Sequence, residues 1–153
     1  MVTRIVVLTV LAASVSMSGS TMAQRPASPT VQVYKTPTCG CCGLWVKHLE
    51  EHGFATRVTE IEDLAETKAK LGVPARVQSC HTATVDGYVI EGHVPATDVQ
   101  RLLQERPAVA GLAVPGMPIG SPGMEVPNMK PQAYRVFTFD KQGQVQVFAS
   151  HGN

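Results

Sequence analysis

The chain has 153 residues, 13 of them basic and 12 acidic, which gives a formal net charge of +1 at pH 7. This length allows one domain with a substantial hydrophobic core. The balanced charge, with no basic face in the sequence, argues against nucleic acid or an anionic membrane surface as a partner.

The first 23 residues have the features of a secretory signal peptide. Arg4 supplies a short basic start, residues 5–15 form an apolar run too short to span a bilayer, and residues 21–23 form a small-x-small cleavage site. A retained membrane anchor is the alternative. We predict that residues 1–23 are removed, that residues 24–30 form a disordered leader, and that the mature protein lies in the periplasm with no membrane segment.

Strand and helix signals alternate along residues 31–106. An apolar stripe of Leu44, Trp45 and Leu49 at helical spacing predicts the first helix. The Asp-Gly dipeptide at 86–87, between two β-rich runs, predicts a tight hairpin. The predicted elements in chain order are strand 31–34, helix 41–52, strand 54–59, helix 61–71, strands 81–85 and 88–91, and helix 95–105. This β-α-β-α-β-β-α order predicts an α/β fold with a thioredoxin-like domain.

Residues 107–153 differ in character from the preceding domain. Residues 107–131 hold six prolines and show no helical or strand periodicity, which is typical of a long functional or disordered loop. Residues 134–139 and 144–148 are β-rich and flank a short turn, so we predict a final hairpin. We therefore interpret residues 107–153 as a C-terminal extension made of a Pro- and Met-rich loop and a β-hairpin.

Three of the four cysteines, Cys39, Cys41 and Cys42, lie in the stretch TPTCGCCG, where the first strand leads into the first helix. A disulfide within this cluster would close almost no loop and would add little stability. We therefore interpret the cluster as redox-active or metal-binding thiols rather than as a structural disulfide. A helix N-terminus lowers the pKa of a nearby thiol and favours the thiolate, which is both a nucleophile and a metal ligand. Cys39 and Cys42 are in CxxC register, and we predict that they act as a catalytic redox pair.

Cys41 distinguishes this motif from a plain CxxC pair. A dithiol oxidoreductase has no evident use for a third thiol, whereas soft thiolates bind Cu(I), zinc or iron–sulfur clusters. Cys41 and Cys42 project in different directions from one turn, which suits several metal ions bridged by shared sulfurs better than one tetrahedral zinc. We expect Cys80 to face this cluster, at the position where thioredoxin-like folds place a cis-proline. A buried core cysteine is the alternative.

All three methionines that follow the signal peptide, Met117, Met124 and Met129, lie in the Pro-rich loop. Thioether sulfur is a ligand for Cu(I) and of little use to zinc, although methionine also fills irregular gaps in a core. We prefer Met117 and Met124, which sit in the paired phrases GMPIG and PGME. The predicted metal ligands are therefore Cys39, Cys41, Cys42, Cys80, Met117 and Met124.

The five histidines give weaker signals. His48 and His52 lie four residues apart on a highly charged helix face and are expected to be solvated. His81 adjoins Cys80, but neighbouring side chains on a strand face opposite ways. The sequence singles out none of the histidines as a ligand, including His93, which follows the hairpin, and leaves open which of them bind metal.

Residues 31–125 resemble the CopG-type exported copper-resistance proteins of Gram-negative bacteria. The phrases that carry the resemblance are TPTCGCCG at 36–43, SCHTATVDGYVIEGHVPATDV at 79–99 and GLAVPGMPIGSPGME at 111–125. The resemblance implies a thioredoxin-like domain whose C-terminal extension helps to bind metal, and a copper cluster bridged by cysteine sulfurs beside the CxCC motif. It also implies interconversion of Cu(I) and Cu(II) in copper resistance, with periplasmic copper-export or redox proteins as partners.

Three functions fit these residues: a copper-binding oxidoreductase, a passive copper carrier, and a plain thiol–disulfide oxidoreductase that binds copper adventitiously. Cys41 and the clustered methionines argue against the third function, and the sequence does not separate the first two. We expect a monomer, because no long apolar pattern demands a partner.

Overall fold

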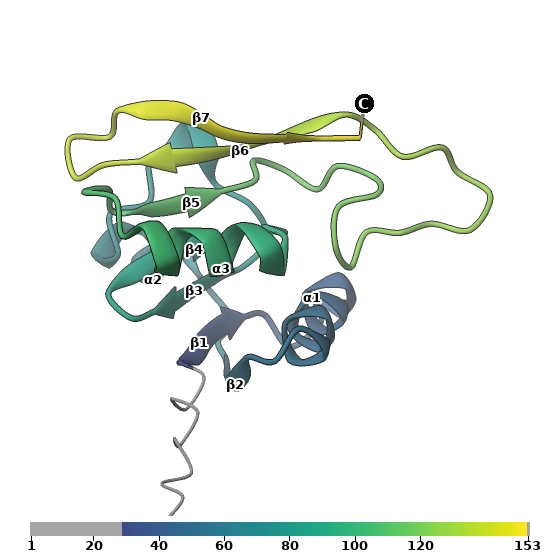
Figure 1. Ribbon diagram of the computed structural model, residues 1–153. Coiled ribbons are helices and arrows are strands. Elements are labelled where there is room, and N and C mark those ends of the chain that lie inside the picture. Colours follow the sequence, from purple (N-terminus) through teal and green to yellow (C-terminus); the bar gives the residue numbers. More distant parts are fainter. Residues whose placement is uncertain (1–28, 153) are drawn as a thin grey trace, which may run out of the picture.

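Figure 1 shows the computed structural model, which describes residues 29–152 as a mixed sheet of seven strands with three α-helices around it. The strands are β1 (Thr30–Lys35), β2 (Ala55–Glu60), β3 (Thr82–Val85), β4 (Tyr88–Glu91), β5 (Gly111–Ala113), β6 (Tyr134–Phe139) and β7 (Val145–His151). The helices are α1 (Gly40–Glu51), α2 (Ala65–Lys70) and α3 (Ala96–Glu105), with a short 3₁₀ helix η1 (Ala75–Val77). None of the helices in this part of the chain is long and apolar enough to cross a membrane.

The element order predicted for residues 31–106 is confirmed, with small shifts at the ends. The second predicted helix starts at Ala65 rather than at 61, because the Asp63 carboxylate accepts the Ala65 N–H and forms a turn there. Thr30, expected in the leader, already belongs to β1. The predicted signal peptide, residues 1–23, lies outside the described residues.

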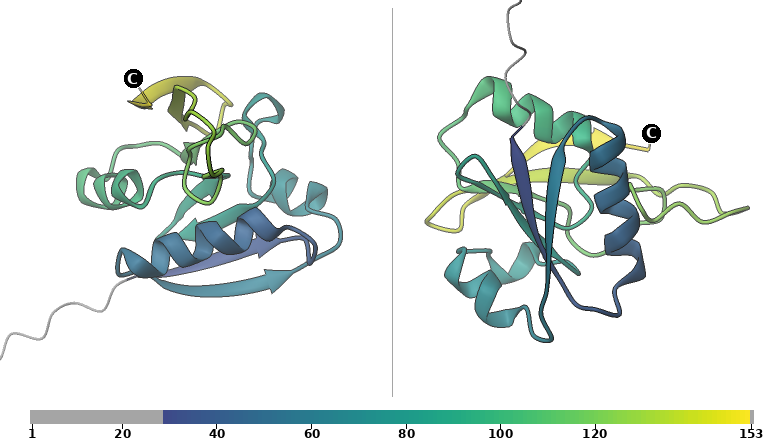
Figure 2. Two further views of the ribbon diagram at one scale, coloured as in Figure 1. Left: turned by 90° about the vertical axis from the view of Figure 1, so that its right-hand side faces the viewer. Right: turned by 90° about the horizontal axis from the view of Figure 1, so that it is seen from below.

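The path of the chain brings the start of α1 next to the start of β3. The sheet order is β2-β1-β3-β4-β5-β6-β7, with β1 parallel to β2 and antiparallel to β3. The chain therefore leaves β1 for α1 at the edge where it enters β3. α1 and α3 pack on one face of the sheet, and α2 lies on the other (Figure 2).

The buried face of α1 differs in one residue from the predicted stripe. Cys42, Trp45, Val46 and Leu49 are buried, whereas Leu44 is 55% exposed. The prediction is wrong at Leu44 because the buried positions recur every three or four residues from Cys42, and Leu44 falls beside that row. The Trp45 indole N–H donates to the Val94 carbonyl at 2.8 Å and so fixes α1 against the segment that leads into α3.

The C-terminal extension continues the sheet. The prediction of a loop over 107–131 is wrong at residues 111–113, which form β5 between β4 and β6. A three-residue strand is too short for periodicity to reveal it. Glycine is required at Gly111, because a Cβ there would collide with the Val89 carbonyl. The predicted final hairpin is present as β6 and β7.

Candidate metal centre

The CxCC motif lies where β1 passes into α1. The Cys39 N–H donates to the Thr36 carbonyl at 3.1 Å, and Cys39 is the N-cap residue of α1. Cys41 and Cys42 occupy the first turn, next to backbone N–H groups that have no partner within the helix. Cys39 and Cys42 are joined by a disulfide with Cα atoms 5.4 Å apart, and Cys41 is a free thiol. The motif thus places all three sulfurs at the positive end of the helix dipole.

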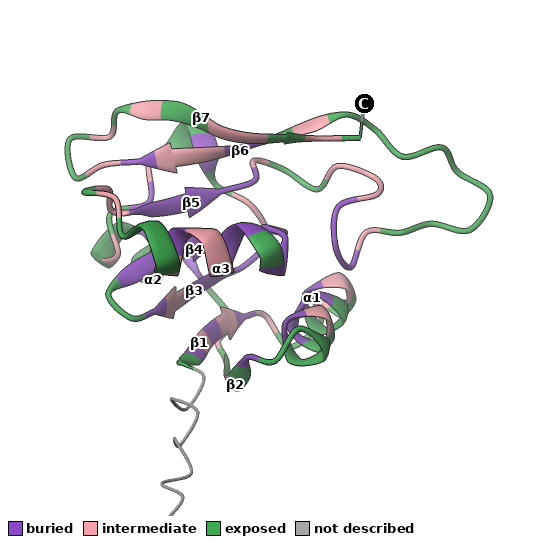
Figure 3. Ribbon diagram, in the orientation of Figure 1, coloured by how far each residue is buried: buried purple, intermediate pink, exposed green. Residues whose placement is uncertain are grey.

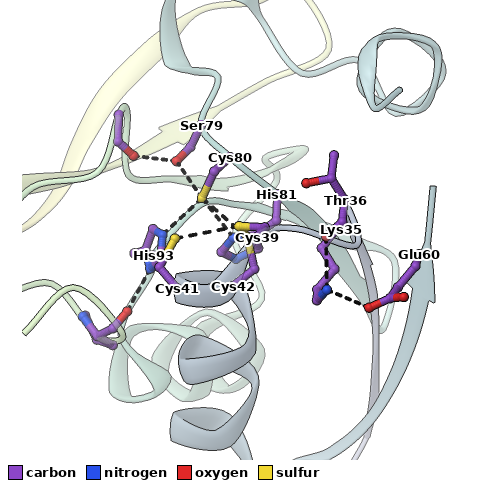
Figure 4. The surroundings of a disulfide bond; sticks show 12 residues. Lys35, Thr36, Cys39, Cys41, Cys42, Glu60, Ser79, Cys80, His81 and His93 are labelled. Carbon is purple, nitrogen blue, oxygen red and sulfur yellow. Dashed lines mark hydrogen bonds and ion pairs between the residues drawn. A yellow bond between two sulfur atoms is a disulfide. The ribbon is translucent and has the colours of Figure 1, made fainter. Parts of the chain in front are cut away.

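Cys80 lies across from this motif, on the segment that precedes β3 (Figure 4). Its Sγ atom is 3.7 Å from Cys42 Sγ, and Cys41 Sγ is 3.6 Å from Cys39 Sγ. The four sulfur atoms all lie within 4.8 Å of one another. No peptide bond in residues 29–152 is cis, so the chain reaches this position with an ordinary trans backbone at Cys80. The antiparallel pairing of β1 and β3 brings the two cysteine-bearing segments together.

Two histidines that the sequence did not predict as ligands approach the same sulfur. His93 Nε2 lies 3.1 Å from Cys80 Sγ, and His81 Nδ1 lies 3.4 Å from it. The expectation that His81 points away from Cys80 is wrong, because both residues precede β3 and strand alternation does not apply there. The predicted hairpin contained the signal for His93: the register that pairs Thr82 with Glu91 continues outward to Cys80 opposite His93.

Hydrogen bonding orients the His93 ring. Its Nδ1 atom lies 2.8 Å from the Pro122 carbonyl, which can only accept, so Nδ1 carries the proton. Nε2 therefore presents a lone pair toward Cys80 Sγ, as expected of an imidazole whose second nitrogen is held by an outer partner. Nε2 of His81 is buried and has no hydrogen-bond partner within the described chain. A buried polar atom of this kind is typical of a functional site.

Burial governs the protonation of these groups. It raises the pKa of the Cys80 thiol to about 11, and a neighbouring Cys41 thiolate acts in the same direction. Burial also lowers the pKa of His93, and it lowers the pKa of His81 well below the usual range with help from His93 and Lys68. The two imidazoles are thus neutral and can donate lone pairs, while the Cys80 thiol keeps its proton until a metal cation replaces it.

His48 has a structural role. Its side chain is half-buried, and Nε2 accepts the Ala96 N–H at the start of α3 at 3.1 Å. Burial, followed by the charge of His52, lowers the pKa of His48. The expectation of a solvated side chain is therefore wrong for His48, since it supplies an acceptor to an N–H that the helix itself leaves unpaired.

The Pro- and Met-rich loop packs over the first turns of α1. Its residues 121–123 are buried (Figure 3). Met124, which is half-buried, follows Gly123 at this contact. Met117 is 51% exposed, and the carbonyl of the preceding Gly116 accepts the hydroxyl proton of Ser79, the neighbour of Cys80. The loop backbone beside both methionines therefore lies against the segments that carry the cysteines.

We expect Gly123→Ala to displace this loop from α1. A Cβ at Gly123 would lie 2.8 Å from both the Cys41 carbonyl oxygen and the Trp45 nitrogen, and its φ of +82° strains an L-residue. The free energy of unfolding should fall by about 1–3 kcal/mol, and the loop should be cleaved faster in limited proteolysis.

Gly43→Ala is the matched control for this substitution. Its Cβ would have nothing within 4 Å, and the residue lies inside α1. Replacing a helical glycine should raise the free energy of unfolding by about 0.5–1 kcal/mol. Urea denaturation and proteolysis of both variants measure the difference. Indistinguishable behaviour of the two would mean that the loop does not depend on its contact with α1.

Comparison with solved structures identifies the family. Two structures titled copper resistance protein CopG, form 1 and form 2, are each 44% identical to this chain. The match covers 81% of this chain and 98% of each of theirs, with a TM-score of 0.76. The chain belongs to the CopG family. Membership places the clustered sulfurs in a family whose solved members are named for copper resistance.

A second comparison matches only part of the CopG-family chain. Residues 77–124 match a family model described as a protein of unknown function, DUF411. This segment includes Cys80, His81 and His93 and the Met-rich part of the loop, but it begins after the CxCC motif. The search of curated proteins found no match. The family model therefore covers Cys80, His81 and His93 of the candidate centre but not the CxCC cysteines.

Proposed function

We propose that this protein binds copper in the periplasm and interconverts Cu(I) and Cu(II) as part of copper resistance. The observation that carries the proposal is the group of four cysteine sulfurs within 4.8 Å of one another. One member of that group, Cys80, also belongs to a second group with His81 and His93. Soft thiolates favour Cu(I), and imidazoles bind both oxidation states.

The arrangement of donors supports a site for more than one ion. Cys80 Sγ lies 3.7 Å from Cys42 Sγ, 3.1 Å from His93 Nε2 and 3.4 Å from His81 Nδ1. A thiolate in such a position can bridge two metal ions. We propose Cys39, Cys41, Cys42 and Cys80 as the thiolate ligands and add His93, whose Nε2 atom faces the shared sulfur. Met117 and Met124 complete the proposed set because thioethers bind Cu(I).

The Cys39–Cys42 pair is the proposed catalytic redox couple. When the two thiols form the disulfide, they release two electrons and two protons, and the electrons reduce two Cu(II) ions to Cu(I). In the reverse step the disulfide takes two electrons from two Cu(I) ions and two protons from solvent, which restores the two thiols and yields two Cu(II) ions. The proposal includes a thioredoxin-like unit over residues 31–106, which the pairing of β1 with parallel β2 and antiparallel β3 supports. Periplasmic copper-export or redox proteins are the proposed partners of a monomeric protein.

Anaerobic titration of the reduced protein with Cu(I) tests this function. Several ions per chain, followed by reversible oxidation and reduction of the loaded protein, are the expected results. Tight binding without reversible cycling would identify a passive carrier instead. Efficient insulin reduction that is unchanged in Cys41→Ser, with no specific copper binding, would reject the copper function and support a thiol–disulfide oxidoreductase, an activity that the Cys39–Cys42 disulfide favours.

A further inference from the structure

A buried ion pair, Lys68 with Glu91, contacts the segment that carries Cys80. Glu91, the last residue of β4, is fully buried, and Lys68 of α2 is 5% exposed. The Lys68 ammonium donates to the Glu91 carboxylate and, at 2.8 Å, to the Thr82 hydroxyl. The Thr82 hydroxyl in turn donates to the second carboxylate oxygen at 2.6 Å. These contacts pair the two buried charges and hydrogen-bond both carboxylate oxygens.

The same carboxylate also holds the backbone next to Cys80. Glu91 Oε1 accepts the Ser79 N–H at 2.6 Å, across 12 residues of sequence. Hydrogen bonds from a backbone N–H to an ionised carboxylate are among the strong ones in proteins. Burial raises the pKa of the Glu91 carboxyl, and the Lys68 ammonium is the first of the groups that oppose this rise. The ion pair therefore supplies a firmly placed acceptor beside the cysteine.

Glu91 is connected to the Met-rich loop as well. Its backbone carbonyl accepts the Val114 N–H at 2.9 Å, where the loop leaves β5. The Ser79 hydroxyl donates to the Gly116 carbonyl, immediately before Met117. One residue at the end of β4 thus fixes two segments: the one that carries Cys80 and the first residues of the loop.

We infer that Glu91 is a positioning residue of the metal centre, which sets the place of Cys80 between Cys42 and His93 through the Ser79 N–H. Lys68 is the counter-charge that allows the carboxylate to be buried. This inference rests on the proposed function for its effect on copper, while its effect on Cys80 itself is independent of copper. The hydrogen bonds of the Glu91 side chain go to Lys68, Thr82 and the Ser79 N–H, so it acts on Cys80 through the backbone.

Two double variants separate positioning from stability. Lys68→Met/Glu91→Gln removes both charges but keeps a carbonyl oxygen to accept the Ser79 N–H. Lys68→Met/Glu91→Leu removes the charges and the acceptor. Replacing a buried ion pair by apolar residues of similar size is often neutral or stabilising, so both variants should fold. If the leucine variant does not fold, Glu91→Asp replaces it, because the shorter carboxylate keeps its charge but draws away from Ser79.

The first measurement needs no metal. In a Cys41→Ser background with the Cys39–Cys42 disulfide intact, Cys80 is the one free thiol among the four cysteines of the chain. Its alkylation by iodoacetamide should be about tenfold faster in the leucine variant, because the Ser79 N–H then has no side-chain acceptor and the segment is free to open. The glutamine variant should react at nearly the unsubstituted rate.

The second measurement uses Cu(I) alone, with all four cysteines present and reduced. The leucine variant should bind Cu(I) about tenfold more weakly and show an altered thiolate-to-copper absorption, while the glutamine variant keeps both properties. Equal alkylation rates in the two folded variants would overturn the inference. A tenfold difference in alkylation would support the positioning of Cys80 even if the unsubstituted protein bound no Cu(I), a result that would reject the proposed function alone.

Discussion

Reduction of the Cys39–Cys42 disulfide is expected to raise the affinity of the protein for Cu(I) on the order of a hundredfold. The disulfide removes two of the four clustered thiols and leaves Cys41 and Cys80. Disulfide sulfur carries no negative charge and is a poor ligand, whereas each thiolate binds Cu(I) directly. The oxidised protein should therefore keep only the donors around Cys80.

Competition with a chromophoric Cu(I) chelator under anaerobic conditions measures this effect. One sample is fully reduced and freed of reductant, and the other is oxidised with diamide and checked by mass spectrometry for the Cys39–Cys42 bond. The double variant Cys39→Ser/Cys42→Ser is the matched control, because it cannot form this disulfide. Its Cu(I) affinity should be low and, in protein that mass spectrometry shows free of a Cys41–Cys80 disulfide, the same with or without diamide. Equal affinities of the oxidised and reduced unsubstituted protein would contradict the prediction.

The same sulfurs cannot serve as a disulfide and as copper ligands at one time. Cys39 and Cys42 have Cα atoms 5.4 Å apart, a separation that allows the bond, and both lie in or beside the first turn of α1. The N-terminus of the helix favours their thiolates in the absence of metal. Copper binding and disulfide formation therefore compete, and under the proposed function the reduction of two Cu(II) ions at the pair would leave only the thiols of Cys41 and Cys80 to hold the product.

Much of the fold could be predicted because its signals are local. The order of elements in residues 31–106 follows from alternating patterns and turn residues, each of which spans only a few positions. β5 was missed because three residues carry no period, and its place in the sheet depends on the distant strands β4 and β6. Leu44 was misplaced because a one-residue rotation of a helix face is not visible in a short stripe.

The four cysteines of the candidate site could be proposed from the sequence, whereas the side chains that support Cys80 could not. The CxCC motif is local, and the facing position of Cys80 depended on recognising the order of the strands. His93 was not predicted, because its approach to Cys80 requires the exact hairpin register to be carried two residues beyond the paired strands. Glu91 was also missed, since a carboxylate in a β-rich run gives no sign of a buried lysine 23 residues away.

Cys80→Ser should have the largest effect of any single cysteine substitution. Its sulfur lies 3.7 Å from Cys42 Sγ and 3.1 Å from His93 Nε2, so it is the one thiol that both groups of donors share. A serine hydroxyl is a hard oxygen donor that does not replace thiolate toward Cu(I). We expect the Cu(I) stoichiometry to fall and the thiolate-to-copper absorption to change, while the melting temperature stays within a few degrees.

A double-mutant cycle with His93→Gln makes this prediction sharper. If Cys80 and His93 hold the same ion, His93→Gln should weaken Cu(I) binding by about 10- to 100-fold in the unsubstituted protein. In the Cys80→Ser background, where that ion is already lost, the histidine substitution should have little further effect, because residues that act on one site are not additive. His52→Gln, at the exposed residue that follows α1, is the matched control and should change neither protein. Unaltered stoichiometry and absorption in Cys80→Ser would remove Cys80 from the site. Fully additive losses would instead place the thiol and the imidazole on separate ions.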